Sequence, residues 1–78
     1  MVDYVDWLKT AATKVENLPR NTRFVLRDLF EGTKWNTLQN RERRELGRKF
    51  RYCVDSNRIL NVIVIESPKG VATTYKKT

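Results

Sequence analysis

A basic amphipathic segment in the middle of the chain limits the folds that this sequence can adopt. Residues 40–56 contain no proline, and their apolar residues Leu46, Phe50, Cys53 and Val54 recur at helical spacing. Arginines occupy a different face of the same helix. Because a helix of this length is stabilised mainly by burial of its apolar face, we expect residues 40–56 to pack on a core that the rest of the chain supplies.

The flanking segments predict the elements of that core. We expect a helix at 3–17 that begins at Asp3, a strand at 22–26, short helices within 27–38, the long basic helix at 40–56 and a β-hairpin at 59–75. This α-β-α-α-β-β order is typical of an α+β winged helix-turn-helix domain. In such a domain the first strand joins the hairpin in a small three-stranded antiparallel sheet. We expect one domain over residues 1–78.

Two residues of the basic helix have predicted structural roles. Asn40 is the candidate N-cap, since asparagine is favoured at that position. Gly47 interrupts the helical pattern at a cost of about 1 kcal/mol relative to alanine. That cost predicts the close approach of another element at Gly47.

The composition excludes several classes of protein. The 78 residues include no histidine and a single cysteine, Cys53, so the commonest general base is absent and neither an internal disulfide nor a zinc cluster can form. The carboxylates of Asp28 and Glu31 are interpreted as helix-end groups. We therefore expect no catalytic residues, metal site, cofactor or small-molecule substrate. No apolar run approaches the roughly 20 residues of a membrane span, and the acidic N-terminus is unlike a signal peptide, so we expect a cytoplasmic protein.

The net charge of +7 is concentrated in two segments. Residues 41–51 carry six basic and two acidic residues, and residues 67–78 carry three lysines and no acid. On a helical wheel, four arginines of the first segment fall within about 80° of one another: Arg41, Arg44, Arg48 and Arg51. We call these four residues the arginine stripe.

The arginine stripe and the hairpin lysines predict a DNA-binding surface. A major groove admits one α-helix, and guanidinium groups bond to phosphate or to guanine edges. The sequence therefore predicts a non-enzymatic transcriptional regulator of a phage or mobile element, with helix 41–51 in the major groove of double-stranded DNA and the hairpin along the backbone. The predicted contact residues are Arg41, Arg44, Arg48, Arg51, Lys69, Lys76, Lys77 and Asn40.

The charge pattern leaves three alternatives open. An acidic surface on a partner protein attracts the same stripe, so the chain could be an interaction module or inhibitor. RNA binding gains weight if Tyr52, Tyr75 or Trp7 is exposed in a basic groove that allows stacking. A homodimer is open as well, through the first helix or the hairpin edge, and an exposed Trp7 would mark a partner surface.

The middle of the chain resembles a known family. Leu29-Phe30-x-Gly32-x-x-Trp35-x-x-Leu38, followed by Arg43-x-x-Leu46-Gly47-x-x-Phe50, is similar to the signature G-x-x-W-x-x-L-x(4)-R-x-x-L-G-x-x-F of small bacterial and phage domains of unknown function. The resemblance implies a short winged-helix-like domain with no established catalytic activity. It also implies that the glycines, aromatics and leucines of the motif are scaffold, and that Arg43 bonds within the fold. The arginine stripe lies outside this signature.

Overall fold

The computed structural model describes residues 2–66 and 72–78. Along the chain, the elements are α1 (Tyr4–Glu16), β1 (Arg23–Phe24), the 3-10 helix η1 (Leu26–Leu29), α2 (Gly32–Trp35), α3 (Asn40–Asp55), β2 (Val62–Glu66) and β3 (Thr74–Lys77). The described residues thus form an α+β fold with a three-stranded antiparallel sheet, as the sequence predicts. Within those ranges, no helix has both the length and the apolar character needed to cross a membrane.

The sheet joins a short strand from the first third of the chain with the two C-terminal strands. Its strand order is β1-β3-β2, and both pairings are antiparallel. Phe24 of β1 lies opposite Tyr75 of β3, and Tyr75 in turn lies opposite Val64 of β2. The short first strand therefore pairs with the C-terminal strand, which is the arrangement expected from the element order.

The helix α1 begins and packs as its sequence pattern predicts. The backbone N–H of Asp6 donates to Asp3 Oδ1 at 3.2 Å, so Asp3 satisfies one of the unpaired donors of the first turn. Ala11 and Val15 are fully buried. Leu8 packs partly buried against the same core. The apolar stripe of this helix covers one side of the domain core.

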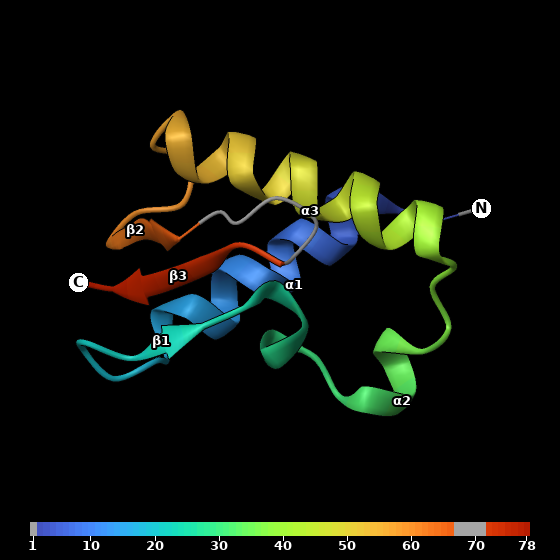
Figure 1. The fold of residues 1–78 in the computed structure, drawn as a ribbon, viewed down its shortest axis with the longest axis horizontal. Helices are drawn as coiled ribbons and strands as arrows, with labels where there is room; N and C mark the ends of the chain where they lie inside the picture. Colours follow the sequence, from blue (N-terminus) through green and yellow to red (C-terminus); the bar gives the residue numbers. More distant parts are fainter. Residues whose placement is uncertain (1, 67–71) are drawn as a thin grey trace.

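The long helix α3 lies across that core above the sheet, with α1 behind it (Figure 1). Leu46 and Phe50 are fully buried, and Val54 is almost so. The Phe50 ring meets the Tyr75 ring edge to face, with the ring centroids 5.0 Å apart. Because these residues fix one face of α3 against the sheet, the other face of the helix is held out toward solvent.

The prediction of a strand at 22–26 is wrong in its length, because the observed strand is shorter. The strand β1 covers only Arg23 and Phe24, and the chain then turns into η1. The Asp28 carboxylate accepts a hydrogen bond from the Val25 N–H at 3.0 Å, which stabilises that turn. Leu26 and Leu29 are both buried. Their burial and the Asp28 bond together favour a 3-10 helix over a longer strand.

Three further expectations differ from the structure. The N-cap of α3 is Gln39 rather than Asn40, and the Gln39 N–H donates to Glu42 Oε1 at 2.7 Å. The first strand of the hairpin, β2, begins at Val62 instead of residue 59. The last strand ends at Lys77 instead of residue 75, because backbone bonds of 2.8 Å between Lys77 and the segment Asn21–Thr22 extend its pairing.

Candidate nucleic-acid interface

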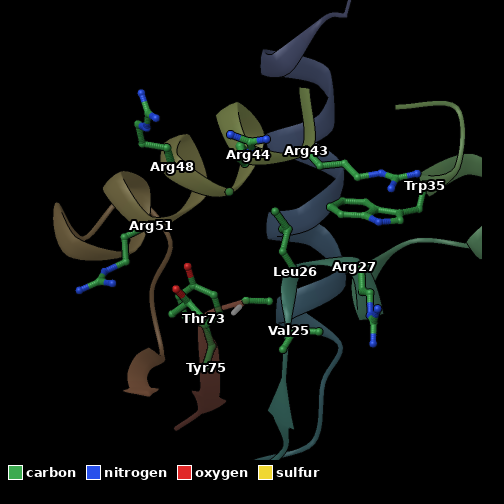
Figure 2. Close-up of a pocket in the computed structure, with 12 residues that line it drawn as sticks. Val25, Leu26, Arg27, Trp35, Arg43, Arg44, Arg48, Arg51, Thr73 and Tyr75 are labelled. Carbon is green, nitrogen blue, oxygen red and sulfur yellow. The ribbon is translucent and has the colours of Figure 1, made fainter. Parts of the chain in front are cut away.

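A groove of about 730 Å³ lies between α3 and two other segments of the chain, one at the start of η1 and one at the start of β3 (Figure 2). One wall is α3 itself, and the others are the segment from Val25 to Arg27 and the segment from Ala72 to Tyr75. The lining residues are Val25, Leu26, Arg27, Trp35, Arg43, Arg44, Gly47, Arg48, Arg51, Ala72, Thr73 and Tyr75. Segments far apart in the sequence thus place five arginines around one groove. We call it the arginine groove.

The arginines of α3 differ in how far neighbouring groups neutralise them. Arg44 is exposed and has no ion pair among the described residues. Arg48 lies 3.7 Å from Glu45, but its side chain is 78% exposed, so this contact contributes little stability. Arg51 is half-buried, and its Nε lies 3.3 Å from Asp55 Oδ2. The charge most available to a ligand is therefore that of Arg44 and Arg48.

The structure brings only part of the predicted contact set together. Arg44, Arg48 and Arg51 line the arginine groove, whereas Arg41 is exposed on the first turn of α3 outside the lining. Asn40 accepts a hydrogen bond of 3.4 Å from Arg43 Nη1, and it also lies outside the lining. Their roles as nucleic-acid contacts stay predictions.

Of the three predicted lysines, the two that the structure describes do not line the arginine groove. Lys77 Nζ donates to the carbonyl oxygen of Val15 at 2.8 Å, so its ammonium group holds the end of α1. Lys76 lies on β3 between Arg23 and Ile63 in the sheet register. Lys69 lies outside the described residues. We therefore do not include Lys77 in the proposed interface below.

Two groove arginines, Arg43 and Arg27, are absent from the contact set predicted from the sequence. The Arg43 guanidinium lies over the Trp35 ring, 5.8 Å from its centroid (Figure 2). Arg43 thus bonds within the fold, as the family resemblance implies, yet it also faces the groove. Arg27 was missed altogether. The three arginines at 20, 23 and 27 were a visible signal, but only the folded chain shows which of them lines the groove.

The floor of the groove contains bare helix backbone at Gly47. Apart from its chain neighbours and the backbone of α3 itself, a Cβ atom built on Gly47 would meet no atom within 4 Å among the described residues. The close approach predicted there is therefore not found in the described part of the chain. Within residues 2–66 and 72–78, Gly47 instead leaves the surface of α3 open where it lines the groove.

Tyr75 closes the inner end of the groove. Its side chain is only 2% exposed and packs on Phe24 and Phe50. Burial raises the pKa of the Tyr75 hydroxyl from 10.0 to about 12, which outweighs the lowering by Arg51 and by a hydrogen bond with Thr73. Tyr75 is thus a neutral wall of the groove and is not exposed for stacking.

Comparison with known proteins assigns this chain to a family. The profile of a domain of unknown function, DUF1413, matches residues 9–77. The chain belongs to the DUF1413 family. No curated protein matches it significantly. A solved structure of LP1413 from SCCmec type IV, described as a nucleic acids binding protein, superposes with a TM-score of 0.67. The two share 21% sequence identity over 95% of this chain and 91% of that chain, so the DUF1413 domain has the fold of that protein.

The aromatic residues near α2 belong to the scaffold of the DUF1413 domain. Trp7 packs on Phe30 at 4.7 Å between ring centroids and on Trp35 at 6.5 Å. Lys34 covers the Trp7 ring at 5.1 Å. Trp7 is half-buried in this aromatic cluster, so it does not show the exposure that would mark a partner surface.

A second hollow, of about 880 Å³, lies on the other side of α3 in the DUF1413 domain, against the start of α1. Tyr52 and Val5 line it and are 61% and 62% exposed. Arg48 lines both hollows, so it stands on the ridge between them. Among the described residues, no three histidine, cysteine or acidic side chains come together as a metal site would require.

Proposed function

We propose that this DUF1413 domain binds nucleic acid through the arginine groove and is not an enzyme. The observation that carries the proposal is the set of five arginines that α3 and the Val25–Arg27 segment place around one open groove. Guanidinium groups form charge-assisted, often bidentate bonds to phosphate oxygens. A polyanionic ligand would bring several phosphates to these groups at once and would release counterions. The nucleic acids binding protein of the same fold adds support to the proposal.

The first form of the proposal is a winged-helix protein that binds duplex DNA. In this form α3 enters the major groove and the hairpin follows the backbone, as in the transcriptional regulator predicted from the sequence. The exposed side chains of Arg41, Arg44 and Arg48 support it, since they lie between the first turn and the middle of α3. A homodimer stays a prediction, for which the exposed Ile63 on the edge strand β2 offers a surface.

The second form is a single strand of nucleic acid lying in the arginine groove. The specific observation in its favour is the apolar wall formed by Val25, Leu26 and Trp35, which lies across the groove from the α3 arginines 44, 48 and 51 (Figure 2). Single strands expose base faces that pack on apolar and aromatic side chains while phosphates meet the basic groups. A concave groove of this kind accommodates a strand more readily than it accommodates the convex surface of a duplex.

Binding of one labelled oligonucleotide, as single strand and as annealed duplex, tests the proposal and distinguishes its two forms. Fluorescence anisotropy at low salt should show binding, and the tighter of the two ligands identifies the form. We expect the double variant Arg44→Ala/Arg48→Ala to weaken binding by about tenfold or more, because two phosphate contacts are lost.

The matched control removes two equally exposed positive charges from α1. The double variant Lys9→Ala/Lys14→Ala has the same net charge as the arginine variant, but neither lysine lines a groove. We expect it to bind within about twofold of the wild type, apart from a weak long-range effect of charge. Failure of the wild type to bind either ligand, or equal weakening by both double variants, would contradict the proposal.

A protein partner is the second candidate function, and the hollow beside α1 favours it. Tyrosine and arginine are enriched at protein interfaces, and Tyr52 and Arg58 line this hollow beside the exposed Val5. An acidic partner protein would form a complex that salt disrupts and that the oligonucleotide does not compete away. Competition by the oligonucleotide would place both ligands on the arginine groove.

A further inference from the structure

Gly47 is unexpected in the interior of α3. Glycine destabilises a helix interior relative to alanine, because more backbone freedom is lost on folding. Such a glycine is normally explained by a neighbouring element that leaves no room for a side chain. Beyond its chain neighbours and the backbone of its own helix, no atom of the described residues lies within 4 Å of a Cβ built at Gly47. Packing within the described part of the domain therefore gives no reason for a glycine.

The surroundings of Gly47 suggest a different reason. Residues three and four positions away are its neighbours on the helix surface. Those neighbours are Arg43, Arg44 and Arg51, which all line the arginine groove together with Gly47. The remaining neighbour, Phe50, turns into the core. A patch of bare backbone is thus bordered on both sides along α3 by arginines.

We propose that Gly47 is the contact site for one nucleotide of the bound nucleic acid, whose sugar and phosphate pack directly on the α3 backbone. This inference rests on the function proposed above. Without a side chain at residue 47, a strand can approach the helix closely enough for its phosphates to reach the arginines one turn before and one turn after. A methyl group there would hold the strand away from the floor of the groove. The glycine therefore favours binding at the expense of helix stability.

The proposal predicts that one substitution changes stability and binding in opposite directions. Gly47→Ala should raise the melting temperature by about 4 °C, because alanine favours the helix and the described residues leave space for its methyl group. The same variant should bind the oligonucleotide about fivefold more weakly, the loss expected for one impaired phosphate contact. Gly47→Leu should bind more weakly still.

Gly32→Ala is the matched control. Gly32 is the first residue of α2, and a Cβ there also meets no atom within 4 Å among the described residues. Gly32 does not line the arginine groove. We expect Gly32→Ala to leave oligonucleotide affinity within about twofold of the wild type, since no phosphate contact is changed. A comparable loss in both alanine variants would overturn the proposal.

The measurements on Gly47→Ala decide between a binding role and a packing role. Unchanged affinity in a protein that melts higher would overturn the proposal while leaving the nucleic-acid function intact. A lowered melting temperature would also overturn it, because the glycine would then be required by packing. Absence of binding by the wild type would instead remove the proposed function itself, and that result is separate from either outcome for the variant.

Discussion

At the scale of single residues, the arginines of α3 have chemically different environments. Arg44 has no ion pair among the described residues, Arg48 has a weak exposed contact with Glu45, and Arg51 is held at 3.3 Å by Asp55. Binding a phosphate would require Arg51 to give up part of an existing interaction, whereas Arg44 loses only hydration. The binding energy of the groove is therefore expected to come more from Arg44 than from Arg51.

The buried hydroxyl of Tyr75 predicts how stability depends on pH. Its pKa is raised to about 12 in the folded protein from 10.0 in the unfolded chain, chiefly by burial. The unfolded state therefore loses its proton first as the pH rises, and the stability from this group, complete below pH 10, declines as the pH rises toward 12. A pKa that is one pH unit higher in the folded state than in the unfolded state corresponds to about 1.4 kcal/mol of unfolding free energy.

Denaturation by urea at a series of pH values checks this expectation. The variant Tyr75→Phe keeps the ring contacts with Phe24 and Phe50 but has no ionisable hydroxyl. The difference in unfolding free energy between wild type and variant should shift in favour of the variant above pH 10. A difference that stays constant across this range would show that Tyr75 has no raised pKa.

At the scale of elements, α3 depends on a bond at its N-terminus. Glu42 accepts the Gln39 N–H at 2.7 Å and places a negative charge in the first turn, where the helix dipole favours it. We expect Glu42→Ala to lower the free energy of unfolding by about 1 kcal/mol. Because an acid is removed beside the arginine stripe, oligonucleotide binding should not weaken. Thermal denaturation and anisotropy on the same variant test both parts, and unchanged stability would contradict the capping role.

The sequence predicts elements well where one strong local pattern decides them. The helices α1 and α3 follow from apolar residues at helical spacing, such as Ala11 with Val15 and Leu46 with Phe50. The end of β1 at Phe24 does not follow from such a pattern. The end of this strand depends on the hydrogen bond to the Asp28 carboxylate and on the burial of Leu26, and both are seen only in the folded chain.

The candidate site was predictable only in part for a similar reason. The wheel positions of Arg44, Arg48 and Arg51 are a property of one helix, so the sequence alone places them on one face. The groove needs Arg27 and Thr73 as well, which tertiary packing brings beside α3 from both ends of the chain. Tertiary packing also removes a predicted contact residue from the site, because Lys77 bonds to Val15, which lies 62 positions away in the sequence.

At the scale of the whole molecule, the net charge of +7 is distributed unevenly over the surface. One side of α3 borders a groove with five arginines, and the other side borders a hollow where Glu45 and Asp3 accompany the basic residues. Such a distribution attracts a polyanion toward one side of the molecule and raises its association rate at low salt. The attraction should weaken as salt screens these charges.

The salt dependence of nucleic-acid binding tests this interpretation most directly. If duplex DNA engages about four to six phosphates, the logarithm of the association constant should fall with the logarithm of salt concentration with a slope of roughly −4 to −5, and less steeply for a single strand. The double variant Arg44→Ala/Arg48→Ala should flatten that slope by roughly 2 on duplex DNA, because two phosphate contacts are lost. A slope near zero, or an unchanged slope in the variant, would contradict phosphate binding at the arginine groove.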